Sequence, residues 1–242
     1  MKLIIAKNKR IGDKKAFEII KSQVTKKPNS LIGLAVGKTT DGLYKLISKE
    51  AAKNPKTWSK LKLFQIDENL GVVPDSSLSF NFEIRKELKN LLKIINPGNI
   101  FLMDGLKNPK TIIKKGYEFI RKNKGIDLII LGLGPSYDPH IAYNTTGKSS
   151  LNSGMRVVDL HPKIIKKMRC RDAVNRISTK GITLGIKDIL ETKKVLLIAY
   201  GKEKAKSLKL ILKEKVNMKK GSATALLLHK DLEIITDKDA VK

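Results

Sequence analysis

Two short segments combine carboxylates with a histidine in patterns suited to proton transfer. Asp67 and Glu68 end the expected strand Phe64-Gln65-Ile66, so a carboxylate there can project from a strand end into a cleft. Partial burial raises the pKa of such a carboxyl group and suits it to removing a proton from carbon. A surface or helix-capping aspartate is the simpler alternative for the same pattern.

The second segment places Asp138 two residues before His140, in a loop after the apolar residues 128–131. A carboxylate at this spacing can fix the tautomer and orientation of the imidazole, which then shuttles protons near neutral pH. The chain has two other histidines. His161 lies beside Pro162 in a lysine-rich stretch and is expected to be exposed, whereas His229 follows an apolar run and fits a structural histidine. His140 is therefore the catalytic candidate.

A third segment, residues 33–40, leads from an expected strand into a helical pattern and contains Gly37, Lys38, Thr39 and Thr40. A glycine there lets backbone amides approach an anion, and the helix N-terminus adds unpaired N–H groups, so the segment can cradle a phosphate. It is not a nucleotide-binding P-loop, because Ile32 stands where that motif needs its first glycine. An ordinary strand-to-helix turn remains the alternative. The Gly132-Leu133-Gly134 turn fails as a dinucleotide motif because its third glycine position is Tyr137.

Arginines are concentrated in one region. Of the seven, four lie within 21 residues: Arg156, Arg169, Arg171 and Arg176. This clustering suggests bidentate contact with a phosphate or carboxylate, and Lys204 could add a further positive charge. Solvated surface charge is the competing explanation, above all for Arg171 and Arg176.

These candidate residues must be positioned by alternating strands and helices. Short apolar runs predict strands at residues 3–6, 31–36, 63–67, 127–131, 195–200 and 232–236. Between the first two, Asp13 is expected to cap a helix whose apolar face carries Ala16, Ile20 and Val24. With no linker visible, residues 1–242 are predicted to form one α/β domain. The expected architecture is a doubly wound, mostly parallel, Rossmann-like sheet with helices on both faces.

Composition narrows the range of partners. The 242 residues carry a formal net charge of +27, but 43 of the 50 basic side chains are lysines and only 5% of residues are aromatic. Without a nucleic-acid-binding motif or stacking platforms, no nucleic-acid partner is expected. No segment suits a signal peptide or a membrane span, and the single cysteine, Cys170, excludes a disulfide framework. A cytoplasmic protein without membrane attachment is expected.

The order and spacing of these segments resemble the glucosamine-6-phosphate deaminase and 6-phosphogluconolactonase superfamily over nearly the whole chain. Residues 33–40 resemble its strand–loop–helix segment, Asp67-Glu68 its Asp-Glu pair, and residues 138–144 its Asp-Gly-His-Ile-Ala-Phe-Asn signature. Residues 156–160, 183–185, 201–205 and 226–229 resemble later family segments. The sequence after His140 and the downstream Arg-Val-Val-Asp-Leu are similar to the deaminase branch.

The resemblance implies isomerisation and deamination of an amino-sugar phosphate to a keto-sugar phosphate and ammonia, without a metal or cofactor. Asp67 would move a proton between C2 and C1, and His140, oriented by Asp138, would assist ring opening. The phosphate of this small phosphorylated sugar would be held by residues 37–40 (Gly37, Lys38, Thr39, Thr40) together with Arg169 and Lys204. A homo-oligomer is left open.

Several residues depart from the deaminase pattern. Thr145 occupies the position of a relay glutamate, Pro139 replaces a glycine, Ser136 and Tyr137 are extra residues, and Val158 replaces a lysine of allosterically regulated members. These departures keep two alternatives open. One is a lactonase that hydrolyses 6-phosphogluconolactone with His140 as general base, and the other is a phosphosugar-binding homologue with weakened catalysis.

Overall fold

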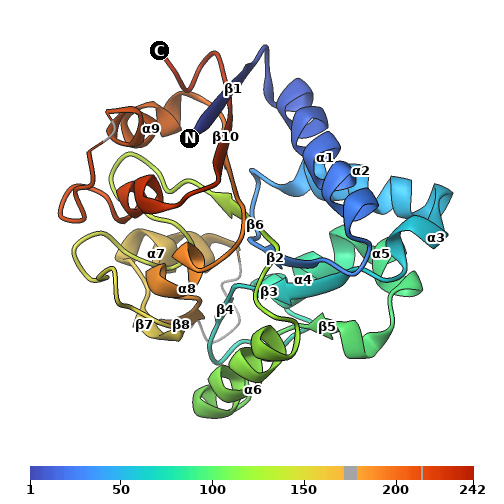
Figure 1. Cartoon of the computed structure of the whole chain (residues 1–242). Coiled ribbons are helices and arrows are strands. Elements are labelled where there is room, and N and C mark those ends of the chain that lie inside the picture. The colour runs from blue at the N-terminus through green and yellow to red at the C-terminus, as the bar shows by residue number, and fades with distance from the viewer. Residues whose placement is uncertain (172–178, 214) are drawn as a thin grey trace.

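A seven-stranded parallel sheet forms the centre of the molecule in the computed structural model, which describes residues 1–171, 179–213 and 215–242 (Figure 1). Its strand order is β1-β10-β9-β6-β2-β3-β5. The strands are β1 (Lys2–Ala6), β2 (Leu31–Leu34), β3 (Lys62–Gln65), β5 (Ile100–Phe101), β6 (Leu128–Gly132), β9 (Val195–Ala199) and β10 (Leu232–Asp237).

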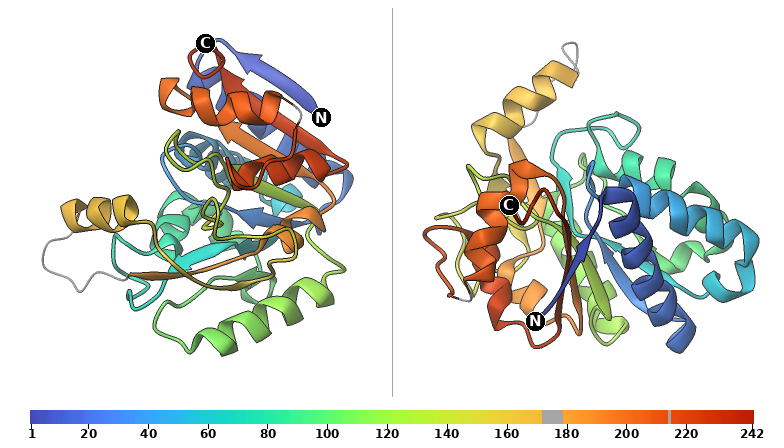
Figure 2. Two further views of the ribbon diagram at one scale, coloured as in Figure 1. Left: turned by 90° about the vertical axis from the view of Figure 1, so that its left-hand side faces the viewer. Right: turned by 90° about the horizontal axis from the view of Figure 1, so that it is seen from above.

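Helices cover both faces of this sheet, as Figure 2 shows in the view from above. One face packs against α1 (Lys9–Lys26), α2 (Asp41–Lys53), α3 (Pro55–Trp58), α4 (Phe80–Glu87) and α5 (Lys89–Ile94). The other packs against α6 (Pro109–Lys122), α8 (Ile186–Leu190), α9 (Ala205–Leu212) and the 3-10 helix η3 (Ser222–Leu228). Successive residues of β6 alternate between the two cores, with Leu128 and Ile130 on the first face and Ile129 and Leu131 on the second. The expected α/β class with helices on both faces is confirmed.

The strand order reverses between β2 and β6, which are neighbouring parallel strands. After β2 the chain continues to β3 and β5 on one side, and after β6 it continues to β9 and β10 on the other. The loops at the carboxyl ends of β2 and β6 therefore diverge and leave a crevice, where open α/β sheets bind their ligands.

A small antiparallel sheet, β4-β8-β7, extends from this end of the main sheet. It contains β4 (Asp67–Asn69), β7 (Arg156–Asp159) and β8 (Lys180–Thr183). The helix that follows β7, α7 (Pro162–Arg171), stands out from the body of the molecule in both panels of Figure 2. Two further short 3-10 helices, η1 (Pro97–Asn99) and η2 (Lys202–Lys204), lie in loops.

All six expected strands occur in the main sheet, with end points shifted by one or two residues. The expected role of Asp13 is wrong. The cap of α1 is Asn8, whose side chain accepts a hydrogen bond from Ile11 N, and Asp13 lies inside the helix, where it is buried and paired with Lys9 at 2.7 Å. The apolar face formed by Ala16, Ile20 and Val24 is buried as expected. No helix in the described part of the chain is long and apolar enough to cross a bilayer.

Candidate active site

A cavity of about 410 Å³ opens at the carboxyl ends of β2 and β6. Its walls come from the loop after β2, the start of β4, the loop after β6, the first turn of α7 and η2. Most of the site residues predicted from the sequence line this cavity. They are Gly37, Lys38, Thr39, Thr40, Asp67, His140 and Lys204.

Internal hydrogen bonds hold the shape of the loop after β2. Gly37 has a φ of +149°, a conformation that L side chains rarely adopt, and a Cβ there would point into open space. Thr40 donates its hydroxyl to the carbonyls of Ala35 and Gly37, and Tyr44 donates its hydroxyl to Ala35 O. Because the donors of Thr40 are used inside the loop, this residue maintains the loop shape, while Gly37, Lys38 and Thr39 face the cavity.

Asp67 is a buried carboxylate at the floor of the cavity. It is 5% exposed, and no described residue donates a hydrogen bond to its Oδ1 atom. Burial, and secondarily the charge of Glu68, raise the pKa of Asp67 well above its ordinary value. The backbone of Asp67 is fixed by pairing with Thr183 of β8. An unpaired carboxylate with a raised pKa at a rigid position is suited to act as a general base.

Its neighbour Glu68 has a different role. It is fully buried, and its two oxygens accept five hydrogen bonds: from the backbone N–H groups of Asn69, Phe80 and Asn81 and from the side chains of Gln65 and Ser79. Phe80 and Asn81 are the first residues of α4, so the carboxylate binds the helix N-terminus. Glu68 therefore anchors α4 beside the cavity, while Phe80 lines it.

His140 is oriented by Asp138, which is 2% exposed. Nδ1 of His140 lies 2.9 Å from Oδ2 of Asp138, and the other carboxylate oxygen accepts a hydrogen bond from Thr146 N at 2.9 Å. Burial alone would raise the pKa of Asp138. The hydrogen bond and charge of His140, together with the hydrogen bonds of Thr146, outweigh the effect of burial and lower the pKa of Asp138 to about 2. Asp138 is thus ionised near neutral pH and holds the proton of His140 on Nδ1, leaving Nε2 as the second ring nitrogen for the cavity.

The expected histidine assignments are otherwise supported for His229 and modified for His161. His229 is buried; its Nε2 lies 2.7 Å from Thr192 O, and its Nδ1 accepts a hydrogen bond from Asp231 N. Both ring nitrogens are used by backbone groups, as in a structural histidine. His161 is half-buried rather than exposed, because its ring packs 5.3 Å from that of Tyr137.

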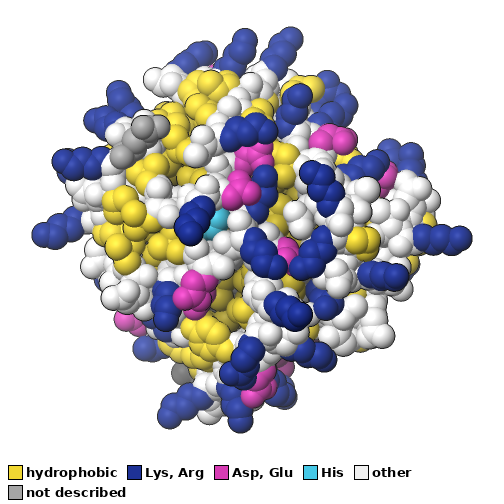
Figure 3. Space-filling view, in the orientation of Figure 1, with side chains coloured by type: hydrophobic (Ala, Val, Ile, Leu, Met, Phe, Trp, Pro, Cys, Tyr) yellow, Lys and Arg dark blue, Asp and Glu magenta, His cyan; other side chains and the backbone are white. Residues whose placement is uncertain are grey.

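The cationic candidates divide into two groups. Lys204 is buried against the cavity, 9% exposed, with Glu203 beside it at 3.5 Å. Arg169 is exposed on α7 and is not among the cavity-lining residues. Arg156 donates to Asn144 and Ser149 away from this cavity, the side chain of Arg171 is not described, and Arg176 lies outside the described residues. Figure 3 shows Lys and Arg side chains spread over the whole visible face rather than gathered over one element.

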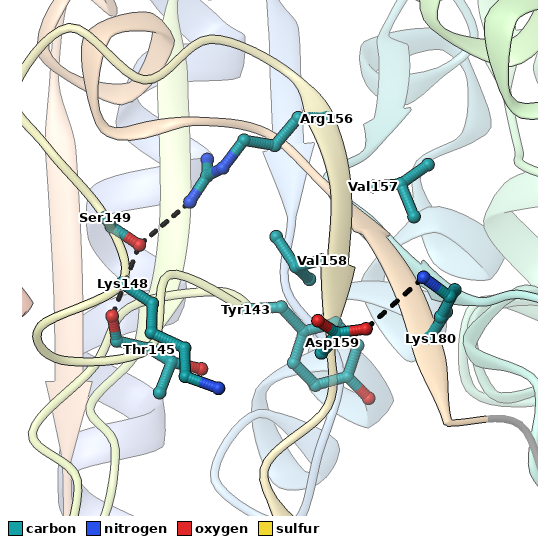
Figure 4. Close-up of a pocket in the computed structure, with 9 residues that line it drawn as sticks. All are labelled: Tyr143, Thr145, Lys148, Ser149, Arg156, Val157, Val158, Asp159 and Lys180. Carbon is teal, nitrogen blue, oxygen red and sulfur yellow. Dashed lines mark hydrogen bonds and ion pairs between the residues drawn. The ribbon is translucent and has the colours of Figure 1, made fainter.

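Thr145, at the position of the relay glutamate, faces a different cavity of about 230 Å³ (Figure 4). There Arg156 donates to Ser149, which in turn donates to Thr145 O, and Lys180 pairs with Asp159 at 3.4 Å. The carboxylates that line the candidate active site are Asp67 and Glu203. Among the described residues, no third carboxylate lines this cavity in place of the glutamate that Thr145 replaces.

Sequence reasoning missed Tyr143 and Lys163, which also line the active-site cavity. Tyr143 is buried and donates its hydroxyl to Asn69. Lys163 lies on the first turn of α7. The neighbouring apolar residues Ile164 and Met168, spaced one helical turn apart, predict which side of α7 faces the protein, but they do not single out Lys163, which projects about 100° away from Ile164.

Comparisons with known proteins agree with this geometry. A family model described as glucosamine-6-phosphate isomerases/6-phosphogluconolactonase matches residues 12–232. Two proteins named glucosamine-6-phosphate deaminase are similar over 99% of this chain. The one from Thermoanaerobacter sp. (strain X514) is 35% identical, with 94% of its length covered, and the one from Mycoplasma mycoides subsp. mycoides SC (strain CCUG 32753 / NCTC 10114 / PG1) is 32% identical, with 96% covered.

Solved structures share the fold. A monomeric glucosamine-6-phosphate deaminase superposes with a TM-score of 0.90 at 23% identity, covering 100% of both chains. The 6-phosphogluconolactonase from Trypanosoma cruzi superposes with a TM-score of 0.76 at 21% identity, covering 99% of this chain and 95% of its own.

Proposed function

The chain belongs to the glucosamine-6-phosphate isomerase/6-phosphogluconolactonase family, and from this membership we propose that it converts glucosamine 6-phosphate and water to fructose 6-phosphate and ammonia. The observation that carries the proposal is one cavity in which an unpaired buried carboxylate, Asp67, and an aspartate-oriented imidazole, His140, lie with a phosphate-type loop. An aldose–ketose isomerising deamination needs these three functions.

The phosphate is proposed to bind at Gly37, Lys38 and Thr39 and to the ammonium of Lys204. The loop offers backbone N–H groups near the start of α2, and Lys204 reaches the cavity from η2 after β9. Binding at two loops on neighbouring sides of the crevice would fix the sugar so that its C1 and C2 atoms lie toward the base.

The proton transfers follow from the protonation states of the two carboxylates. His140, with its proton held on Nδ1 by Asp138, uses Nε2 to take or return a proton at the ring oxygen and C1 hydroxyl, which opens the sugar ring. Asp67 then removes the proton from C2 and delivers it to C1, while one proton of the amine passes to the C1 oxygen, so that the amino-aldehyde becomes a C2 imine with a C1 hydroxyl group. Water adds to the imine carbon and ammonia leaves, giving the C2 ketone.

The test is to incubate the purified protein with glucosamine 6-phosphate and to measure ammonia and fructose 6-phosphate together. Equimolar appearance of both products supports the proposal. Isomerisation without ammonia, or no reaction, refutes it.

Lactone hydrolysis is the second candidate, because Thr145 leaves His140 without the relay glutamate of the deaminase pattern. One observation argues against it. The lactonases that this chain resembles carry an arginine directly after the Asp-Glu pair, whereas this chain has Asn69, whose side-chain amide donates to Leu78 O at 2.7 Å and accepts from the hydroxyl of Tyr143 at 2.8 Å. Hydrolysis of 6-phosphogluconolactone with no release of ammonia from the amino sugar would assign the chain to the lactonase branch instead.

A further inference from the structure

The two extra residues of the loop after β6, Ser136 and Tyr137, connect two walls of the active-site cavity. Ser136 donates its hydroxyl to Glu203 O at 2.8 Å, which ties the loop to η2 and hence to the segment that carries Lys204. The next residue, Tyr137, lines the cavity together with Glu203 and Lys204. The extra residues thus lie at the end of the cavity where the phosphate is proposed to bind.

The ring of Tyr137 in turn contacts the start of α7. Nζ of Lys163 lies 3.9 Å above the ring centroid, and the ring of His161 packs beside it at 5.3 Å between centroids. A cation–π contact at this distance restricts where the ammonium group of a long, flexible side chain lies. Within the described residues, no carboxylate is paired with Lys163, so the ring is the contact that holds its charge at the cavity.

Position along α7, rather than the angle around it, separates this lysine from Arg169. Ile164, Ile165 and Met168 turn one side of α7 toward the apolar cluster that contains Val72 and Leu78. Lys163 and Arg169 both lie off the centre of that side, and both side chains are exposed. Lys163, in the first turn, lines the active-site cavity, whereas Arg169, about 9 Å further along the helix axis, does not.

We propose that Lys163 is a third cationic ligand of the substrate phosphate, and that Tyr137 is the positioning residue that orients it. The inference rests on the proposed function for the identity of the substrate. It assigns three ammonium groups from three separate elements to one phosphate: Lys38 after β2, Lys163 on α7 and Lys204 on η2. The ring occupies one side of the Lys163 ammonium, whose other N–H groups remain for phosphate oxygens.

The test compares Lys163→Met with Lys166→Met, an exposed lysine of the same helix that lines no part of the cavity, so both variants lose one charge. Affinities for fructose 6-phosphate and inorganic phosphate are measured by calorimetry, and KM and kcat for glucosamine 6-phosphate by ammonia release. Lys163→Met is expected to weaken binding of both ligands and to raise KM about tenfold or more, with kcat changed less than about threefold. Lys166→Met is expected to match the wild type.

Tyr137 is tested by Tyr137→Ala and Tyr137→Phe. The alanine variant loses the ring and is expected to weaken fructose 6-phosphate binding about threefold, and the phenylalanine variant, which keeps the ring, is expected to recover most of that loss. A double variant, Tyr137→Ala with Lys163→Met, is expected to bind no worse than Lys163→Met alone, because Tyr137 acts through the lysine. Additive losses would overturn the positioning role.

Two results would overturn the role of Lys163. The first is equal affinity of Lys163→Met and wild type, and the second is an equal loss in Lys163→Met and Lys166→Met, which would indicate a general charge effect. Arg169→Met is included as the rival phosphate ligand, and a loss there without one in Lys163→Met would restore the sequence-based assignment. Because ligand binding is measured without turnover, a wild type that binds fructose 6-phosphate but releases no ammonia refutes the proposed reaction alone.

Discussion

Oδ2 of Asp138 lies 2.9 Å from Nδ1 of His140, inside a loop that begins where β6 ends. The second oxygen of Asp138 is held by the backbone N–H of Thr146, so the carboxylate cannot rotate away from the imidazole without losing a further hydrogen bond. With a pKa of about 2, Asp138 stays ionised wherever the protein is expected to work. The pair therefore defines both the position and the tautomer of His140.

Replacing Asp138 with asparagine is expected to lower kcat about 100-fold, because the amide no longer enforces the tautomer with the proton on Nδ1. KM for glucosamine 6-phosphate should change by less than about threefold, since Asp138 is not among the groups proposed to bind the phosphate. The check is steady-state ammonia release. Since the carboxylate ionises at about 2, the pH–rate profile of the wild type between pH 5 and 9 should carry no limb from Asp138; a kcat for Asp138→Asn within about threefold of wild type would contradict its role.

Asp67→Asn is expected to abolish turnover, with kcat lowered about 1,000-fold and the affinity for fructose 6-phosphate kept within about threefold. The amide cannot accept the C2 proton, and the phosphate contacts are unchanged. Activity of the wild type requires the ionised carboxylate, whose pKa is raised well above its ordinary value of 3.8. The kcat should therefore fall as the pH drops through that raised pKa, and retained turnover in Asp67→Asn would mean that another group is the base.

Burial raises the pKa of both adjacent carboxylates, but amide substitution is expected to change stability in opposite directions, because Glu68 accepts five hydrogen bonds and Oδ1 of Asp67 accepts none from the described residues. Burial raises the pKa of Asp67, so the folded protein binds its proton more tightly than the unfolded chain. Below the ordinary pKa of Asp67, the tighter proton binding does not change the free energy of unfolding. As the pH rises from the ordinary pKa to the raised pKa, the free energy of unfolding falls, and the loss is complete above the raised pKa. Asp67→Asn removes that loss and is expected to raise Tm at pH 7, at about 2–4 °C for each kcal/mol gained, with a smaller gain near pH 4.

Glu68→Gln is expected to lower the free energy of unfolding by about 2–4 kcal/mol. The NH2 group of the glutamine would face donors whose hydrogen bonds the wild-type carboxylate accepts, so those donors would lose their acceptor. The donors are the N–H groups of Asn69, Phe80 and Asn81 and the side chains of Gln65 and Ser79. Urea unfolding of the two variants side by side measures the contrast. A Glu68→Gln protein as stable as the wild type would show that the anchoring of α4 does not depend on the charge of this side chain.

The sequence identified the parts of the fold and site that depend on local pattern. Six of the seven strands of the main sheet were predictable from apolar runs, and the placement of Asp67 and His140 at the cavity was predictable because each follows such a strand. The strands β4, β5, β7 and β8 were not predicted, because they depend on pairing with partners distant in the chain, as in the pairing of Asp67 with Thr183.

The assignment of Arg169 rested on residue type, whereas the proposed contribution of Lys163 depends on the first turn of α7 lying at the cavity. That placement is set by the packing of Ile164 and Met168 in one cluster with Val72, Leu78 and Tyr143, from segments far apart in the sequence. A similar limit applied to Glu68. Its role at the N-terminus of α4 follows from a chain path that returns to it after eleven residues and cannot be derived from the Asp-Glu pair alone.

Lys204→Met is expected to raise KM for glucosamine 6-phosphate about tenfold to 100-fold with a smaller effect on kcat. The residue is 9% exposed, and its ammonium is the charge that the β9 side of the crevice contributes to the cavity. Methionine keeps most of the side-chain volume, so packing around η2 is preserved while the charge-assisted hydrogen bond to the phosphate is lost. The matched control is Lys206→Met, an exposed lysine two residues further on that does not line the cavity. Kinetics at several ionic strengths separate a direct contact from general electrostatic attraction. The increase in KM of Lys204→Met should persist at high salt. An increase that disappears at high salt would mean that Lys204 does not contact the phosphate.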